Sequence, residues 1–174
     1  MINEINTLLT IGTLLSHIFI IITVVYILLR KIKTVKKFFK PIESHFKKNG
    51  LNYAFLTSLF ATLGSLFYSQ IVGFTPCVLC WYQRIFMYVL PIILFIAIIY
   101  KDYKVKKYVI PLSIIGASIA LYHYIVQLTP RFTCVADGVD CSIRYIIGFE
   151  YITIPLMALT AFILITGFTY LQKK

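Results

Sequence analysis

The sequence is poor in charged residues, and acidic residues are especially few. Charged side chains make up 13% of its 174 residues, and only 6 of them are aspartate or glutamate, whereas a soluble domain carries about 25% charged residues. Hydrophobic residues account for 60% of the chain, and the mean hydropathy is +0.87. A soluble domain of this length cannot bury that much apolar surface. The composition therefore excludes a soluble globular domain and indicates a membrane protein.

Five long apolar stretches follow one another, at residues 8–29, 51–72, 76–100, 108–128 and 151–171. Each approaches or exceeds the ~20 residues that a helix needs to cross the hydrocarbon of a bilayer, and in lipid a helix satisfies all of its own backbone groups. No Lys or Arg precedes the first stretch, which is too long for a signal peptide. We therefore predict a retained helix there, with a shallow interfacial helix as the alternative.

These stretches predict an all-α integral membrane protein with a four-helix transmembrane bundle and one extra N-terminal transmembrane helix. Residues 1–50 would form the extra helix and a basic cytoplasmic linker, and residues 51–174 the four-helix domain. Lys and Arg number 14 in the segments 30–48 and 101–107 and the C-terminal tail, against 3 in the other loops. Because basic residues collect in cytoplasmic loops, the cysteine-bearing loops are expected on the outer, extracytoplasmic side, where disulfides persist.

The first cysteine pair, Cys77 and Cys80, stands at the expected start of the third helix. Thr75 is a suitable N-cap and Pro76 suits the first helical position, which would place Cys77 in the first turn. Unpaired backbone N–H groups and the helix dipole favour a thiolate there. Cys80 lies one turn deeper, and Arg84, four residues further, shares its face and would stabilise a Cys80 thiolate or an anionic ligand. We interpret Cys77–Cys80 as a redox-active pair, with a plain stabilising disulfide as the alternative.

The second pair, Cys134 and Cys141, lies in an outer loop with aspartate and glycine between the two cysteines. Alone it would be interpreted as a loop staple, but opposite the first pair it is suited to relaying electrons by thiol–disulfide exchange. Zinc held by all four cysteines is a further alternative, which an oxidising exterior disfavours.

His123 is a candidate site residue near the outer end of the fourth stretch. It follows Gly116 and Ala120 and precedes Gln127 at helical spacing, so the small-residue face that packs helices leads into it. We therefore expect His123 to point into the bundle at about the depth of Cys80. An ionisable residue within a membrane is also a functional candidate. A histidine that only bonds a neighbouring helix is the alternative. His17 is expected to pack or to lie at the interface, and His45 to be solvated.

Cys-Val-Leu-Cys-Trp-Tyr-Gln-Arg at residues 77–84, Leu-Tyr-His-Tyr at 121–124 and the outer-loop cysteine pair resemble the DsbB-type disulfide bond formation proteins, and more closely their short BdbC branch. The resemblance covers about residues 51–171. It implies a bacterial enzyme of the cytoplasmic membrane that reoxidises a DsbA- or BdbD-like thioredoxin-fold thiol oxidase and passes the electrons to a membrane quinone, menaquinone or ubiquinone.

The resemblance also implies a role for each site residue. Cys134 would be attacked by the partner, Cys141 would pair with Cys134 and then exchange with Cys77, and Cys80 would contact the quinone. Arg84 and His123 would lie near the quinone oxygens, and no metal is expected. Two other functions stay open: an enzyme like vitamin K epoxide reductase, and a non-catalytic scaffold with two structural disulfides.

Overall fold

The computed structural model describes residues 2–129, 135–136, 139–146 and 148–172. The described chain is built from five long helices: α1 (Ile2–Leu29), α2 (Lys33–Leu66), α3 (Val78–Ile99), α4 (Lys106–Leu128) and α5 (Ile154–Leu171). All five are long and apolar enough to cross a membrane, which confirms the predicted fold class. A π-helical turn, η1 (Phe67–Ile71), extends α2, a 3-10 turn, η2 (Tyr103–Val105), precedes α4, and two short antiparallel strands, β1 (Val135–Ala136) and β2 (Val139–Asp140), lie in the outer loop.

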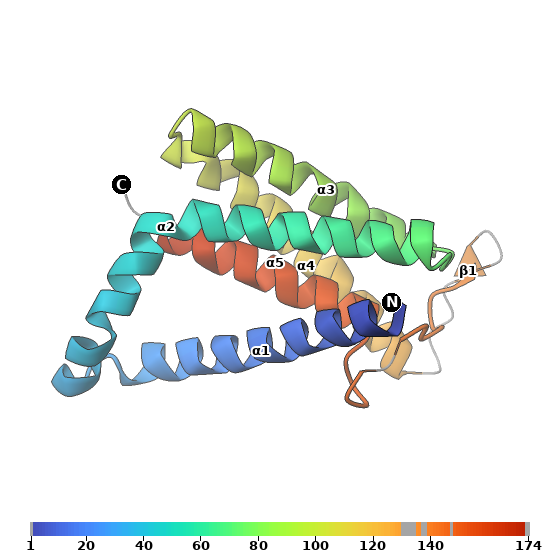
Figure 1. Ribbon diagram of the computed structural model, residues 1–174, viewed down its shortest axis with the longest axis horizontal. Coiled ribbons are helices and arrows are strands. Elements are labelled where there is room, and N and C mark those ends of the chain that lie inside the picture. The colour runs from blue at the N-terminus through green and yellow to red at the C-terminus, as the bar shows by residue number, and fades with distance from the viewer. Residues whose placement is uncertain (1, 130–134, 137–138, 147, 173–174) are drawn as a thin grey trace.

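Helices α2 to α5 form a closed bundle, in which α2 and α4 each pack against both α3 and α5 (Figure 1). The fully buried core between them includes Leu90 and Leu94 of α3, Val109 of α4 and Phe162 of α5. A Cβ on Gly116 would lie 2.3 Å from the Phe162 ring. Only glycine therefore allows α4 and α5 to approach this closely, as small residues do between membrane helices.

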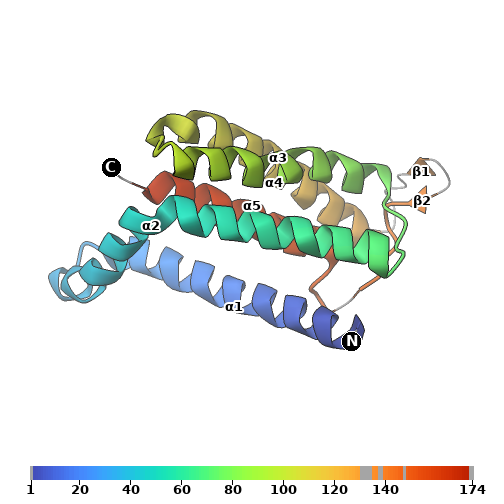
Figure 2. The same cartoon turned by 45° about the horizontal axis from the view of Figure 1, so that its top comes forward.

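Helix α1 lies outside this bundle, along α5 and α2 (Figure 2). Two of its side chains, Thr10 and Thr13, are buried among the described residues, while the remaining face is partly or fully exposed. Such a helix suits a lipid environment on its outer side. The extra N-terminal helix is therefore present and packs on the bundle rather than within it.

Helix boundaries differ from the predicted ones chiefly in the basic segment. Helix α2 begins at Lys33 and not near residue 51, because the Lys- and Phe-rich segment is itself helical and continuous with the span. Figure 1 shows this first part of α2 running at a steep angle to the rest, and Pro41 lies within it, as is common where helices bend. The boundary that we expected at residue 50 thus falls inside a helix, and the division into two domains stays a prediction.

The alternating helix directions bring several distant segments to one end of the molecule. The start of α3, the end of α4 and the start of α5 lie beside the N-terminus and the strands, whereas the α1–α2 and α3–α4 junctions lie at the opposite end (Figure 1). The cysteine motif at the start of α3 and the histidine near the end of α4 are therefore neighbours. The basic junctions are remote from them.

Candidate thiol site and its two cavities

The first cysteine pair stands at the boundary between an extended loop and α3. Cys77 is the N-cap, with φ −73° and ψ 172°, and the helix begins at Val78. The predicted start, with Thr75 as N-cap and Pro76 as the first helical residue, is therefore wrong, because the backbone is non-helical from residue 73 through Cys77. The shift leaves Cys77 at the helix N-terminus, where backbone N–H groups and the dipole favour negative charge.

Cys77 and Cys80 are free thiols whose sulfurs lie 3.4 Å apart. Cys77 is buried, and Cys80 is half-buried one turn further along α3. This separation lets the two sulfurs exchange a proton when the pair is reduced, and a small approach of the side chains would bring them to disulfide distance.

His123 of the neighbouring helix α4 contacts Cys77. Its Nε2 lies 3.7 Å from the Cys77 sulfur and 3.1 Å from the Cys141 carbonyl oxygen, and its Nδ1 lies 2.8 Å from the Gln83 amide nitrogen. Because the amide nitrogen of Gln83 can only donate, Nδ1 accepts and the ring proton is placed on Nε2. That proton points toward the sulfur and the carbonyl. The expectation that His123 faces into the bundle is confirmed, since its exposed fraction is 2%.

Gln83 is a site residue that our sequence analysis missed. It is buried on α3 and holds the His123 ring through Nδ1. The available signal was its spacing, because Leu79, Gln83 and Met87 follow one another every fourth residue along the buried face of α3. A polar residue in that apolar row requires a hydrogen-bonding partner, and His123 supplies it.

Hydrogen bonds lower the pKa of Cys77 from an ordinary value of 9.0 to about 4. The larger contribution comes from the Cys80 thiol, and the His123 ring adds to it, while burial opposes both. A hydrogen bond to a thiolate stabilises the charged form, and a thiolate is the reactive form in thiol–disulfide exchange. Cys77 is therefore the thiolate of the reduced pair.

This lowered pKa predicts how the reduced protein responds to acid. Because a lowered pKa retains the charged form as the pH falls, thiolate ultraviolet absorbance should be constant from about pH 8 to about pH 6 and disappear only toward the pKa of about 4. Subtracting the absorbance of the reduced Cys77→Ala variant assigns the signal to Cys77. A midpoint near the ordinary value of 9.0 would contradict the hydrogen-bonded arrangement.

The second cysteine pair lies partly outside the described residues. Cys141 is disulfide-bonded and buried, and it packs in one cluster with Cys77 and Leu79. Cys134, which we pair with it, is among the residues that are not described. The role of each cysteine stays a prediction.

The loop after Cys141 is bound to the bundle. Arg144 donates through Nε to the Gln127 carbonyl at the end of α4, with 3.0 Å between the atoms. Tyr145 donates to the Thr75 carbonyl at 3.2 Å and stacks on Phe74, with ring centroids 4.7 Å apart. These contacts connect the loop to the ends of both α3 and α4 and hold Cys141 over the first pair.

Two cavities meet at Cys80. The smaller, of about 20 Å³, is lined by Cys77, Cys80, His123 and Cys141, together with residues of the outer loop and the start of α5. The larger, of about 500 Å³, is lined by Cys80, Arg84 and apolar side chains of α1, α2, α3 and α5. Cys80 therefore connects a thiol-lined space with an apolar one.

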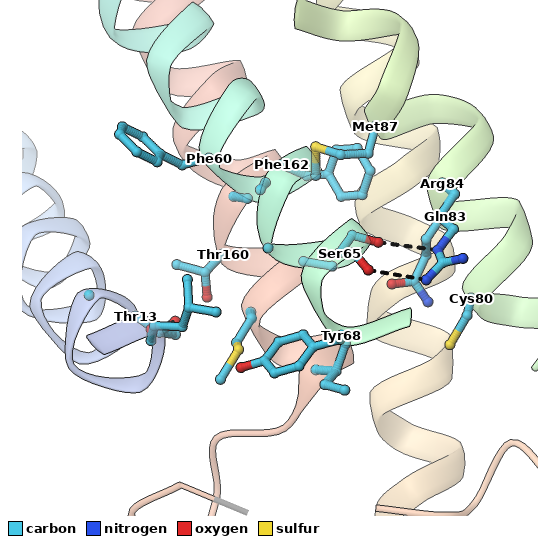
Figure 3. A pocket seen from close by; sticks show the side chains of 18 of the residues that line it. Thr13, Phe60, Ser65, Tyr68, Cys80, Gln83, Arg84, Met87, Thr160 and Phe162 are labelled. Atoms are coloured by element: carbon cyan, nitrogen blue, oxygen red, sulfur yellow. Dashed lines mark hydrogen bonds between the residues drawn. The ribbon is translucent and has the colours of Figure 1, made fainter. Parts of the chain in front are cut away.

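Arg84 lies at the polar end of the larger cavity (Figure 3). Its Nε donates to the Ser65 hydroxyl at 3.1 Å and its Nη2 to the Ser65 carbonyl at 3.3 Å. The guanidinium also lies 5.2 Å from the centre of the Trp81 ring, a cation–π contact. Ser65 lies in the last turn of α2, directly before the π-helix η1. A π-helical turn is a distortion that is often found at functional sites. Ser65 and Ala61 of α2 both line this cavity.

The other two histidines lie away from the thiols. His17 is hydrogen-bonded across to α5, with Nε2 2.8 Å from the Thr160 hydroxyl. His45 is exposed and bonds the Tyr53 hydroxyl at 2.8 Å. Both positions agree with the packing role expected for His17 and the solvated one expected for His45.

A metal ion has one possible location among the described residues. The ligand atoms of Cys77, Cys80 and His123 lie within 4.8 Å of one another, and thiolates with an imidazole are a donor set that zinc accepts. The same atoms are needed for disulfide exchange. The expected absence of a metal stays a prediction.

Comparison with known proteins shows that this chain matches a known family. The family described as "Disulfide bond formation protein DsbB" matches residues 47–172. "Disulfide bond formation protein C" of Bacillus subtilis (strain 168) is 52% identical over 124 residues, which are 69% of this chain and 89% of that protein. "Probable disulfide formation protein C 1" of Bacillus anthracis is 46% identical over 67% of this chain and 86% of its own length. No solved structure matches significantly.

Proposed function

The chain belongs to the DsbB family of disulfide bond formation proteins, and from that premise we propose that it oxidises a thioredoxin-fold thiol oxidase and reduces a membrane quinone. Family membership gives a thiol oxidoreductase with several membrane spans. The partner is proposed to be a DsbA- or BdbD-like protein, and the quinone to be menaquinone or ubiquinone. Disulfides in secreted proteins would be the final product.

The observation that carries this proposal is the position of Cys80 between two cavities. In the smaller one it meets Cys77, His123 and the Cys141 end of the second pair. In the larger one it meets an apolar space that begins at Arg84 and is open to a lipid-soluble molecule. A residue so placed can take electrons from thiols on one side and deliver them on the other.

The proposed electron path uses three coupled exchanges. The partner's dithiol reduces the Cys134–Cys141 disulfide and leaves as a disulfide. The resulting dithiol reduces the oxidised Cys77–Cys80 pair by thiol–disulfide exchange, which restores Cys134–Cys141. The Cys77–Cys80 dithiol then gives two electrons and two protons to the quinone, which leaves as quinol, and the Cys77–Cys80 disulfide forms again.

The residues of the larger cavity fit a quinone. Its ring would lie beside Cys80, with the Arg84 guanidinium as a charged hydrogen-bond donor toward a ring oxygen. Quinones supply two-electron acceptor chemistry when they are bound. The apolar remainder of the lining suits an isoprenoid tail, and the volume of about 500 Å³ falls within the ~300–1,000 Å³ usual for small-molecule sites.

The location follows from the charge distribution. We propose that the cysteine end faces the extracytoplasmic side of a bacterial cytoplasmic membrane, because Lys and Arg collect at the opposite end, in segments 30–48 and 101–107. Residues 51–174 would form the family's four-helix domain, and residues 1–50 the added helix and linker. Disulfides persist on that side.

Two alternative functions are less well supported. A scaffold with two structural disulfides does not need a buried histidine that contacts the Cys77 sulfur. An enzyme like vitamin K epoxide reductase belongs to another family than the one matched over residues 47–172. Neither alternative has a specific observation in its favour.

The test is quinone reduction by the purified full-length protein in detergent, supplied with a reduced thioredoxin-fold partner. We expect loss of quinone in a one-to-one ratio with disulfide formed in the partner, first with ubiquinone and menaquinone analogues. In sealed right-side-out membrane vesicles, partner added outside should support the same reaction. No quinone loss with either analogue would overturn the proposal, and activity only from the inner side would overturn the orientation.

A further inference from the structure

We propose that α1 forms the outer wall of the acceptor cavity, so that the quinone binds between α1 and the four-helix bundle rather than on the bundle alone. This inference rests on the proposed function. The α1 face that lines the cavity consists of Leu8, Leu9, Gly12, Thr13 and Ser16. These residues recur at helical spacing and lie on one side of the helix. Figure 3 shows Thr13 of α1 across the cavity from Cys80 and Arg84.

The wall is held by hydrogen bonds on both sides of the lining segment. Before it, the Tyr68 hydroxyl donates to Asn6 Oδ1 at 3.1 Å. After it, His17 bonds the Tyr151 hydroxyl through Nδ1 at 3.1 Å and the Thr160 hydroxyl through Nε2 at 2.8 Å. Interhelical hydrogen bonds of this kind hold helices together in lipid, where apolar burial provides little attraction. They connect α1 to η1 at one side and to α5 at the other.

Between these anchors α1 contacts the bundle in part and leaves space beside Gly12. A Cβ on Gly12 would meet no atom within 4 Å, whereas a Cβ on Gly64 of α2 would lie 3.6 Å from a Leu9 methyl group. The helix thus touches α2 beside the cavity and leaves open space at Gly12. Because Gly12 lines the cavity of about 500 Å³, this open space is part of that cavity.

The side chains that line the cavity indicate which kind of molecule binds there. Its polar groups include Cys80, Arg84 and Ser65 at one end, while Leu8, Leu9, Phe60 and Leu164 are among the apolar side chains of its lining. A molecule with a polar ring and a long apolar tail matches both ends, and a membrane quinone has that form. Residues 2–29 lie outside the segment that matches the family. The contact between α1 and the quinone would therefore be an addition to the four-helix core.

Photo-crosslinking tests the contact directly, without turnover. The probe is an azido-benzoquinone with a short isoprenoid tail, bound to the oxidised full-length protein and mapped by mass spectrometry of its peptides. We expect label both near Cys80 and within residues 8–16, displaced from both by unmodified quinone. Displaceable label near Cys80 alone would overturn the inference and leave the proposed function standing. Label at neither place would overturn both.

A single substitution tests the same wall kinetically. Gly12→Leu adds an isobutyl group at a position that lines the cavity and where a Cβ meets no atom within 4 Å, and it improves helix propensity. We expect the KM for quinone to rise roughly tenfold or more, as when a ligand site is filled by a few extra carbons. The rate with saturating quinone and the KM for the protein partner should change little.

Gly167→Leu is the matched control. Gly167 lies on α5, a Cβ there also meets nothing within 4 Å, and it does not line the cavity. Its quinone KM should equal that of the unsubstituted protein, which separates filling the cavity from adding a leucine to an exposed helix. If the unsubstituted protein reduces quinone and Gly12→Leu has an unchanged KM, α1 is not a wall of the site.

Discussion

Replacing Cys80 with serine is expected to reduce quinone turnover to the uncatalysed background. Cys80 is the cysteine that borders both the thiol-lined cavity and the apolar one. A serine hydroxyl keeps the shape but cannot form a disulfide with Cys77 or give up electrons. The measurement is the loss of quinone absorbance with the reduced partner in excess. Full turnover by Cys80→Ser would show that the electron path does not pass through this residue.

Cys134→Ser is the control that locates the defect. It removes the residue proposed to meet the partner but leaves Cys77 and Cys80 unchanged. We expect it to fail with the protein partner and still to reduce quinone when a small dithiol reduces the first pair directly. Cys80→Ser should fail with both donors. If both variants failed with the small dithiol, the second pair would be needed for more than contact with the partner.

Replacing His123 with leucine is expected to slow electron transfer from the second cysteine pair to the first by about a hundredfold. The imidazole donates toward the Cys77 sulfur and the Cys141 carbonyl, and loss of a positioned proton donor typically costs a factor of about 100 or more. The variant also leaves the buried Gln83 amide without its partner. Rapid acid quenching followed by thiol alkylation in a single turnover measures this exchange.

Two near-isosteric variants distinguish positioning from a general loss of stability. A glutamine at position 123 can present its amide nitrogen where Nε2 lies, whereas an asparagine reaches only as far as Nδ1. His123→Gln should therefore recover part of the exchange rate, and His123→Asn should resemble His123→Leu. The pH at which the Cys77 thiolate is lost should rise in the two inactive variants. Exchange rates equal to that of the unsubstituted protein in all three variants would mean that His123 only fills space.

The sequence predicted the helices because lipid imposes one backbone solution on a long apolar run. It also predicted the direction of His123, since Gly116 and Ala120 mark the packed face of α4 that continues into it. The start of α3 was predicted wrongly because Thr75 and Pro76 satisfy the preferences of a helix start as well as Cys77 does. Local preferences do not decide between such neighbouring positions when tertiary contacts, here between Tyr145 and Thr75, hold the loop extended.

The features that escaped prediction depend on contacts between distant segments. The role of Gln83 depends on His123, which is 40 residues away along the chain. The π-helical turn that places Ser65 and Tyr68 beside Arg84 and α1 has no pattern of its own in the sequence. The space at Gly12 lies between Asn6, which is bonded to Tyr68 of η1, and His17, which is bonded to Thr160 of α5. No periodicity of α1 reveals a gap beside it.

Because the described cysteines lie at one end of the bundle, the proposed activity depends on the direction in which the chain crosses the membrane. Cys77, Cys80 and Cys141 lie at the same end of the bundle, and the basic α1–α2 junction lies at the other (Figure 1). A copy threaded through the bilayer upside down would have the same helices and the same cavities. Under the proposed function its cysteines would then face the reducing cytoplasm, so that copy would be folded but inactive. With the proposed orientation, the lysines near the junctions would supply the signal that sets the direction of insertion.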